Sequence, residues 1–210
     1  YDPSPGQLQQ LNRSEAYFMI GNLVFENIWL EKIASVNELM PVFDLSSGID
    51  LIQDDHHHSI KNRKRINTDP HIWLSPKALR IMCHNIYIAL KEIIPSDSLV
   101  YKQNYHNLLA ELDSTDREIK KLLSALDSRK FFIYHPALTY FARDYGLQQI
   151  PVEQEGKPPS PFHLKQLINL AEKENIRTIF IQEQFDIENA EVLAKEINGK
   201  IIIIKKIFLL

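Results

Sequence analysis

The hydrophobic positions of the chain follow helical spacing in most of its first half. Apolar residues recur every three or four positions in residues 23–33 and again in residues 76–94. Ser75 and the proline after it supply an N-cap and a favourable first position for the second of these helices. Two short apolar runs, residues 16–20 and 41–45, predict buried strands. The first half is therefore expected to mix short strands with longer helices.

A long polar helix is predicted after Pro95. It begins at Ser96 or Ser98 and continues to about residue 126. At 1.5 Å per residue, roughly 30 residues span about 45 Å. Its middle, residues 111–118, is strongly polar. A helix of this length and polarity suits a spine between two lobes better than a core element.

Strands and helices alternate regularly after residue 129. The expected strands are residues 131–134, 148–152, 178–181 and 200–204, and the expected helices are residues 136–145, 161–175 and 187–197. Continuous apolar strands that alternate with helices predict a mostly parallel sheet with both faces covered. Ligands of such sheets bind beyond the carboxyl ends of the strands.

We therefore predict an α/β fold of two lobes joined by a long backbone helix. The N-terminal α/β lobe is residues 1–95, the linking helix residues 96–127, and the C-terminal α/β lobe residues 128–210. We expect both lobes to be truncated at the outer end. The chain opens without a methionine and closes on an apolar run, as in a fragment or a processed product.

Composition narrows the classes of function. With 44% hydrophobic residues, 210 residues can bury a sizeable core. The net charge of −3 argues against nucleic acid as a partner, since the one basic run, residues 61–65, lies in a polar loop. The single cysteine, Cys83, excludes internal disulfides and Cys-rich zinc sites, and it is expected to be a small core residue. No window of 18 apolar residues predicts a membrane span.

Two histidines precede helical segments, one in each half of the chain. His71 follows Asp69-Pro70, and Trp73 follows it closely. His135 comes directly after an apolar strand and before Pro136, so its ring is expected at the binding edge of the sheet. The residues alone leave two alternatives open, a metal site that joins both histidines and two separate structural turns.

Other polar segments also carry candidate ligands. The tract His56-His57-His58 fits flexible capture of a transition metal, or else an ordinary polar loop. The turn that carries Glu153 and Glu155 could ligate a metal or orient its ligands, or else it is a plain connection capped by Ser160. The remaining histidines are expected to be surface or hydrogen-bonded helix residues: His84, His106 and His163.

Known catalytic patterns do not occur in the sequence. It has no Gly-x-Ser-x-Gly, no Gly-rich phosphate loop and no His-Glu-x-x-His. The case for an enzyme is therefore weak, and a binding protein, which a family resemblance implies, is the leading hypothesis. The alternatives are a metal-dependent hydrolase with Glu153 or Glu155 as base, and an adhesin-like surface protein with a weak metal site.

The order of several motifs resembles one protein family along nearly the whole chain. The motifs are Tyr1-Asp2-Pro3-Ser4-Pro5, Gly21 with Phe25-Glu26 and Trp29-Leu30, Asp69-Pro70-His71-Ile72-Trp73, His135-Pro136, Glu155-Gly156-Lys157-Pro158, and Phe180-Ile181-Gln182-Glu183-Gln184-Phe185. This order resembles the zinc- and manganese-binding solute-binding proteins of bacterial ABC transporters, which include streptococcal lipoprotein adhesins.

The resemblance implies a metal cleft between the two lobes, with up to four protein ligands for the metal. His71 matches the second, and His135 matches the third, which is His in zinc members and Glu in manganese members. The first would precede Tyr1. The last is an acid after a late strand of the second lobe, where this chain has Lys205-Lys206-Ile207 and no acid. The resemblance favours zinc, with manganese as the alternative. Zinc binds neutral imidazole, so affinity is expected to fall below about pH 6.5.

The resemblance also implies the setting in which the protein works. The expected partners are a divalent metal ion and the membrane permease of an ABC transporter, and the receptor itself is expected to be a monomer. Its expected location is periplasmic or extracellular, with or without a lipid anchor.

Overall fold

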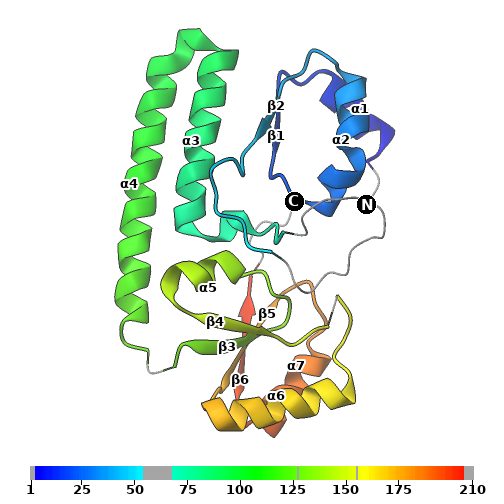
Figure 1. Cartoon of the computed structure of the whole chain (residues 1–210), viewed down its shortest axis with the longest axis vertical. Helices are drawn as coiled ribbons and strands as arrows, with labels where there is room; N and C mark the ends of the chain where they lie inside the picture. Colours follow the sequence, from blue (N-terminus) through cyan, green and yellow to red (C-terminus); the bar gives the residue numbers. More distant parts are fainter. Residues whose placement is uncertain (1–2, 54–67, 127, 155, 206–210) are drawn as a thin grey trace. The chain divides into compact units, whose positions relative to one another are not determined.

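The computed structural model describes residues 3–53, 68–126, 128–154 and 156–205 (Figure 1). The chain divides into two compact units, and for these residues the division falls between Ile119 and Lys120. Both units combine helices with parallel strands, so the predicted α/β class is confirmed. The predicted lobe boundaries after residues 95 and 127 stay predictions.

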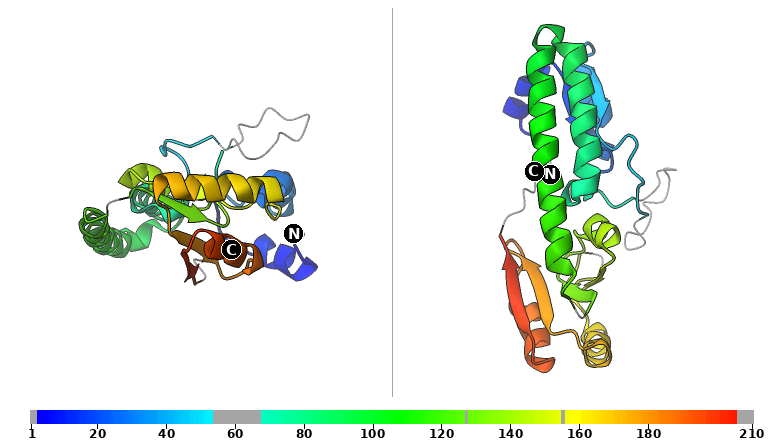
Figure 2. Two further views of the ribbon diagram at one scale, coloured as in Figure 1. Left: turned by 90° about the horizontal axis from the view of Figure 1, so that it is seen from below. Right: turned by 90° about the vertical axis from the view of Figure 1, so that its left-hand side faces the viewer.

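The first unit contains a small parallel sheet and four helices. Its elements are α1 (Pro5–Asn12), β1 (Tyr17–Met19), α2 (Val24–Val36), β2 (Val42–Asp44), the 3-10 turns η1 (Ile72–Leu74) and η2 (Pro95–Asp97), α3 (Pro76–Ile93) and α4 (Ser98–Leu123). The strands β1 and β2 pair in parallel. The helices α3 and α4 lie side by side in all the views (Figures 1 and 2). Arg80 pairs with Asp113 across them, and the rings of Tyr87 and Tyr105 stack at 4.8 Å.

A buried carboxylate organises the turn after β1. Glu26 is 3% exposed, and its two oxygens accept hydrogen bonds from the backbone N–H of Ile20 at 2.7 Å and of Gly21 at 2.8 Å. Gly21 has φ of 105°, and a Cβ there would lie 2.6 Å from the hydroxyl of Ser46. Burial, and then the charge of Glu26, raise the pKa of Tyr17 to about 12. Glu26 thus holds the turn after β1, and Gly21 in this turn packs closely against Ser46 after β2.

This arrangement makes Glu26 a stability residue. Glu26→Ala is expected to lower the free energy of unfolding by about 2 kcal/mol, because two backbone N–H groups lose a charged acceptor. Urea denaturation measures the effect. Glu31→Ala, which removes an exposed carboxylate from the same helix, is the control and should change stability little. Equal losses for the two variants would contradict this role of Glu26.

The second unit is a four-stranded parallel sheet with helices on both faces. Its elements are β3 (Lys130–Ile133), α5 (Thr139–Tyr145), β4 (Gln148–Pro151), α6 (Pro161–Glu174), β5 (Thr178–Gln182), α7 (Glu188–Glu196) and β6 (Lys200–Ile204). The strand order is β4-β3-β5-β6. The helices α6 and α7 lie on one face of this sheet and α5 on the other (Figure 1). The predicted alternation of strands and helices is confirmed.

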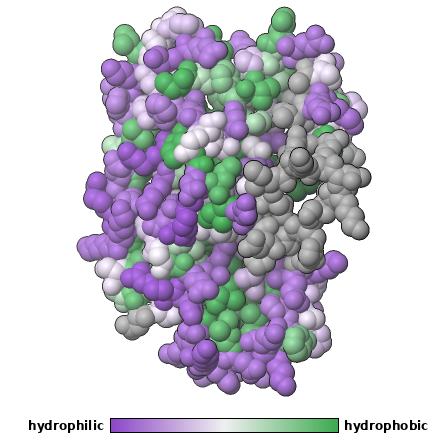
Figure 3. Space-filling model, viewed as in Figure 1, coloured by the Kyte–Doolittle hydropathy of each residue, from purple (hydrophilic) through white to green (hydrophobic). Residues whose placement is uncertain are grey.

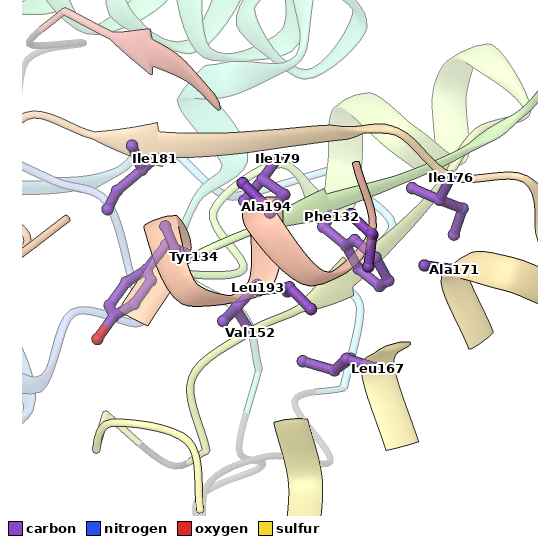
Figure 4. Close-up of a cluster of buried hydrophobic side chains, with 12 residues drawn as sticks. Phe132, Tyr134, Val152, Leu167, Ala171, Ile176, Ile179, Ile181, Leu193 and Ala194 are labelled. Atoms are coloured by element: carbon purple, nitrogen blue, oxygen red, sulfur yellow. The ribbon is translucent and has the colours of Figure 1, made fainter. Parts of the chain in front are cut away.

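The core of this unit lies between the sheet and the pair α6 and α7. Phe132 and Ile179, on neighbouring strands, are fully buried and face Leu193 of α7 and Leu167 of α6 (Figure 4). Ile133, the next residue of β3, is also fully buried and points to the opposite face, as side chains alternate along a strand. Burial on both faces anchors β3 firmly just before His135.

Three expectations about local structure were wrong in detail. The helix α5 begins at Thr139, not at residue 136, because the carbonyl of His135 accepts from the backbone N–H of Ala137 and that of Pro136 from the side chain of Gln149. The long helix α4 ends at Leu123 and not near residue 126. Cys83 is only partly buried, and burial raises the pKa of its thiol.

The surface in view is mostly hydrophilic, with separate apolar areas (Figure 3). Among the described residues the most exposed large apolar side chains are Leu39, Leu99 and Phe162. These three lie on different elements or loops. No helix in the described part of the chain is long and apolar enough to cross a membrane.

Candidate metal centre

His71 is held by a carboxylate two residues before it in the first unit. Asp69 Oδ1 accepts hydrogen bonds from the backbone N–H of His71 at 2.8 Å and from its ring Nδ1 at 2.7 Å. Asp69 is 7% exposed, and its own backbone N–H bonds to the carbonyl of Ile52. The ring of Trp73 lies 5.4 Å from the imidazole. His71 therefore has a fixed ring at the entrance to α3.

His135 is held in the same way by a carboxylate in the second unit. It follows β3, and Glu153 Oε1 accepts a hydrogen bond from its ring Nδ1 at 2.7 Å. The side chain of Glu153 is 6% exposed and that of His135 is 24% exposed. Phe185 stacks on the imidazole at 5.4 Å with an interplanar angle of 28°. The ring thus stands at the carboxyl edge of the sheet, where the sequence predicts it.

Both histidines form carboxylate–histidine pairs through the same ring atom. A carboxylate that accepts from Nδ1 holds the proton there and makes Nε2 the ligating nitrogen. It also raises the basicity of the imidazole as a ligand. Neutral imidazole nitrogen is a preferred donor for Zn²⁺. The two pairs therefore fit zinc chemically.

The described residues of either unit do not make up a complete metal site. Within the described residues of each unit, no group of three His, Cys, Asp or Glu side chains lies close enough to hold a metal ion. Tetrahedral zinc sites use three or four protein ligands. A tight site would need donors in addition to those that the described residues of either unit bring together.

The structure describes some, but not all, of the other candidate ligands and histidines that the sequence offers. Glu153 contacts His135, and its role in metal binding stays a prediction. The predicted cap of α6 is confirmed, because Ser160 accepts from the backbone N–H of His163. His84 is exposed, with its Nδ1 3.4 Å from the hydroxyl of Tyr105. Among the described residues, His163 Nε2 is buried with no hydrogen-bond partner. Glu155 and the tract of residues 56–58 lie outside the described residues.

Three residues that surround the histidines stand in motifs of the family resemblance, but sequence reasoning gave them no role: Asp69, Gln182 and Phe185. Asp69 carried a usable signal, since an acid two positions before a histidine can reach its backbone N–H and its ring. Phe185 and Gln182 had no such signal. They reach His135 from the end of β5 and the turn after it, far away in the sequence.

Curated relatives match nearly the whole chain. A putative metal-binding protein of Chlamydia trachomatis is 28% identical over 199 residues, which cover 94% of this chain and 68% of that protein. The high-affinity zinc uptake system protein ZnuA of Bacillus subtilis is 26% identical over 209 residues, which cover 95% of this chain and 65% of that protein. The chain thus spans about two thirds of the length of these relatives.

Structural and family comparisons agree with these relatives. A crystal structure of a ZnuA deletion mutant with zinc bound superposes with a TM-score of 0.85 at 38% identity, covering 97% of this chain and 75% of that one. The family model described as ZnuA, zinc-uptake complex component A, periplasmic, matches residues 1–207. The predicted family resemblance is confirmed, and this chain belongs to the ZnuA family of zinc-uptake receptors.

Proposed function

We propose that this chain is an extracytoplasmic solute-binding protein that captures zinc and delivers it to the membrane permease of an ABC transporter. The family description, which names zinc uptake and the periplasm, supports the cargo and the location. The name of the Bacillus relative and the zinc-bound ZnuA structure support zinc. The permease, and a receptor that works as a monomer, are part of this proposal.

The ligands that we propose are Nε2 of His71 and Nε2 of His135. The carrying observation is that each Nδ1 lies 2.7 Å from the oxygen of a buried carboxylate, Asp69 in one unit and Glu153 in the other. This pairing recurs around zinc-bound histidine in proteins. Two nitrogen donors also favour zinc over manganese, which prefers oxygen ligands.

The chain acts as a binding protein in this proposal, not as a hydrolase. The family is one of metal-binding transport receptors. Glu153, one of the two candidate bases, is buried and accepts the Nδ1–H of His135. A carboxylate in that position orients a ligand and is poorly placed to activate water. Zinc-dependent turnover of ester or phosphate substrates would contradict this reading.

Calorimetric titration of metal-stripped protein tests the proposed cargo. We expect one zinc ion to bind with Kd below about 1 μM, or about −8 kcal/mol, and manganese to bind more weakly. A zinc Kd above that value, or tighter binding of manganese, would contradict the zinc-receptor function for these 210 residues. The measurement needs no knowledge of the permease.

A further inference from the structure

The turn that carries His135 lacks regular backbone partners. The ladder between β3 and β5 continues as far as Tyr134, whose backbone N–H bonds to the carbonyl of Phe180 at 2.8 Å. The helix α5 begins only at Thr139. Residues 135–138 therefore lie outside both strand and helix, and Pro136 has no N–H to donate. Two of its carbonyls have backbone donors, since that of His135 accepts from Ala137 and that of Leu138 from Ala142. Side chains must satisfy the remaining groups if the turn is to keep one conformation.

Gln182 supplies partners from the neighbouring strand β5. Its side-chain Oε1 accepts from the backbone N–H of His135 at 3.3 Å, and its Nε2 donates to the carbonyl of His135 at 2.8 Å. The amide thereby binds both backbone groups of one residue, as a residue of a paired strand does in a ladder. It extends the pairing of β3 and β5 onto the residue that carries the imidazole.

Gln149 supplies partners from β4, the strand on the other side of β3. Its Oε1 accepts from the backbone N–H of Leu138 at 2.9 Å, and its Nε2 donates to the carbonyl of Pro136 at 3.2 Å. Since β3 lies between β4 and β5, the turn is held from both neighbouring strands. Both glutamine side chains are partly buried in these contacts.

We propose that Gln182 and Gln149 are positioning residues for metal capture, an inference that rests on the proposed zinc-receptor function. They hold the backbone of the turn, while Glu153 and Phe185 hold the ring of His135. A ligand that is already oriented loses less conformational freedom when the ion binds. Groups that orient metal ligands typically change affinity by about 10- to 100-fold when they are removed.

Methionine variants test this role, because methionine keeps the length of glutamine and removes its hydrogen bonds. Gln182→Met and Gln149→Met are each expected to raise the zinc Kd about 10-fold, and the double variant more. Gln184→Met and Gln148→Met, which alter exposed glutamines beside them, are the controls and should bind as the parent does. With Co²⁺ as a probe, the two test variants should also shift the ligand-field absorption bands, whereas a loss of fold stability alone would leave the bands of the folded protein unchanged.

Hydrogen exchange of the metal-free protein separates this inference from the proposed function. Gln182→Met should speed exchange of the His135 amide at least about 10-fold, and leave that of buried Phe132 unchanged, because it removes a specific acceptor. If the parent binds zinc through His135 but the methionine variants match their controls in affinity and spectrum, the positioning role is refuted and the receptor function stands. If the parent does not bind zinc, the receptor function fails. Unchanged exchange of the His135 amide in Gln182→Met would then also refute the role of Gln182 in holding the backbone of the turn.

Discussion

His71→Ala and His135→Ala are each expected to raise the zinc Kd by at least about 100-fold. Zinc bound at structural sites releases about 10–16 kcal/mol, and division among four ligands assigns roughly 3 kcal/mol to each. A change of 1.4 kcal/mol is a factor of ten in Kd, so the loss of one ligand is worth about two powers of ten. Competition with a chromophoric chelator measures affinities in this range.

A surface histidine provides the control for this pair. His106 lies exposed on α4, and His106→Ala should bind zinc as the parent does. Circular dichroism would show that each variant is folded before its affinity is compared. If either ligand variant keeps the affinity of the parent, the zinc is held elsewhere, and the tract of residues 56–58 becomes the first alternative.

The second large loss of zinc affinity is expected when the two buried carboxylates, Asp69 and Glu153, are replaced. Asp69→Asn and Glu153→Gln preserve the size of each side chain but remove the charge that holds the Nδ1 proton of His71 or His135. Outer partners of metal-bound histidines contribute about 10- to 100-fold to affinity. We therefore expect each amide variant to weaken zinc binding by that factor, and by less than loss of the histidine itself.

Matched substitutions of exposed acids control for charge. Asp97→Asn and Glu172→Gln change the same residue types at exposed positions, one in each unit, and should leave the zinc Kd within about twofold of the parent. The same chelator competition applies to all four proteins. If the buried and exposed variants weaken binding equally, general electrostatic attraction explains the effect and the pairing with the histidines does not.

Local patterns were enough to predict most elements of the fold. Three local signals have boundaries of the structure close to them: Ser75 and Pro76 at the start of α3, the break at Pro95, and the break after residue 129. The start of α5 was mispredicted for a tertiary reason. The side chain of Gln149, on a neighbouring strand, donates to the carbonyl of Pro136, so this carbonyl does not accept a helical hydrogen bond.

At the site, too, the sequence reveals features that have a local signal and does not reveal contacts that the tertiary fold makes. Both histidines stand out locally, because each follows or precedes an element boundary next to a proline. The partners of His135 do not, since Glu153 is 18 positions away and Gln182 is 47 positions away. Only the parallel sheet brings the ends of these strands together, so these contacts required the structure.

The central claim is that zinc binds through Nε2 of His71 and His135 while each Nδ1 keeps its proton for a buried carboxylate. Long-range ¹H–¹⁵N spectra of the imidazoles, recorded during a zinc titration of ¹⁵N-histidine-labelled protein, test it directly. We predict that the Nε2 signals of these two residues shift together and saturate at one equivalent of zinc, with Nδ1 still protonated. Unchanged signals from His71 and His135, while those of other histidines move, would contradict the account.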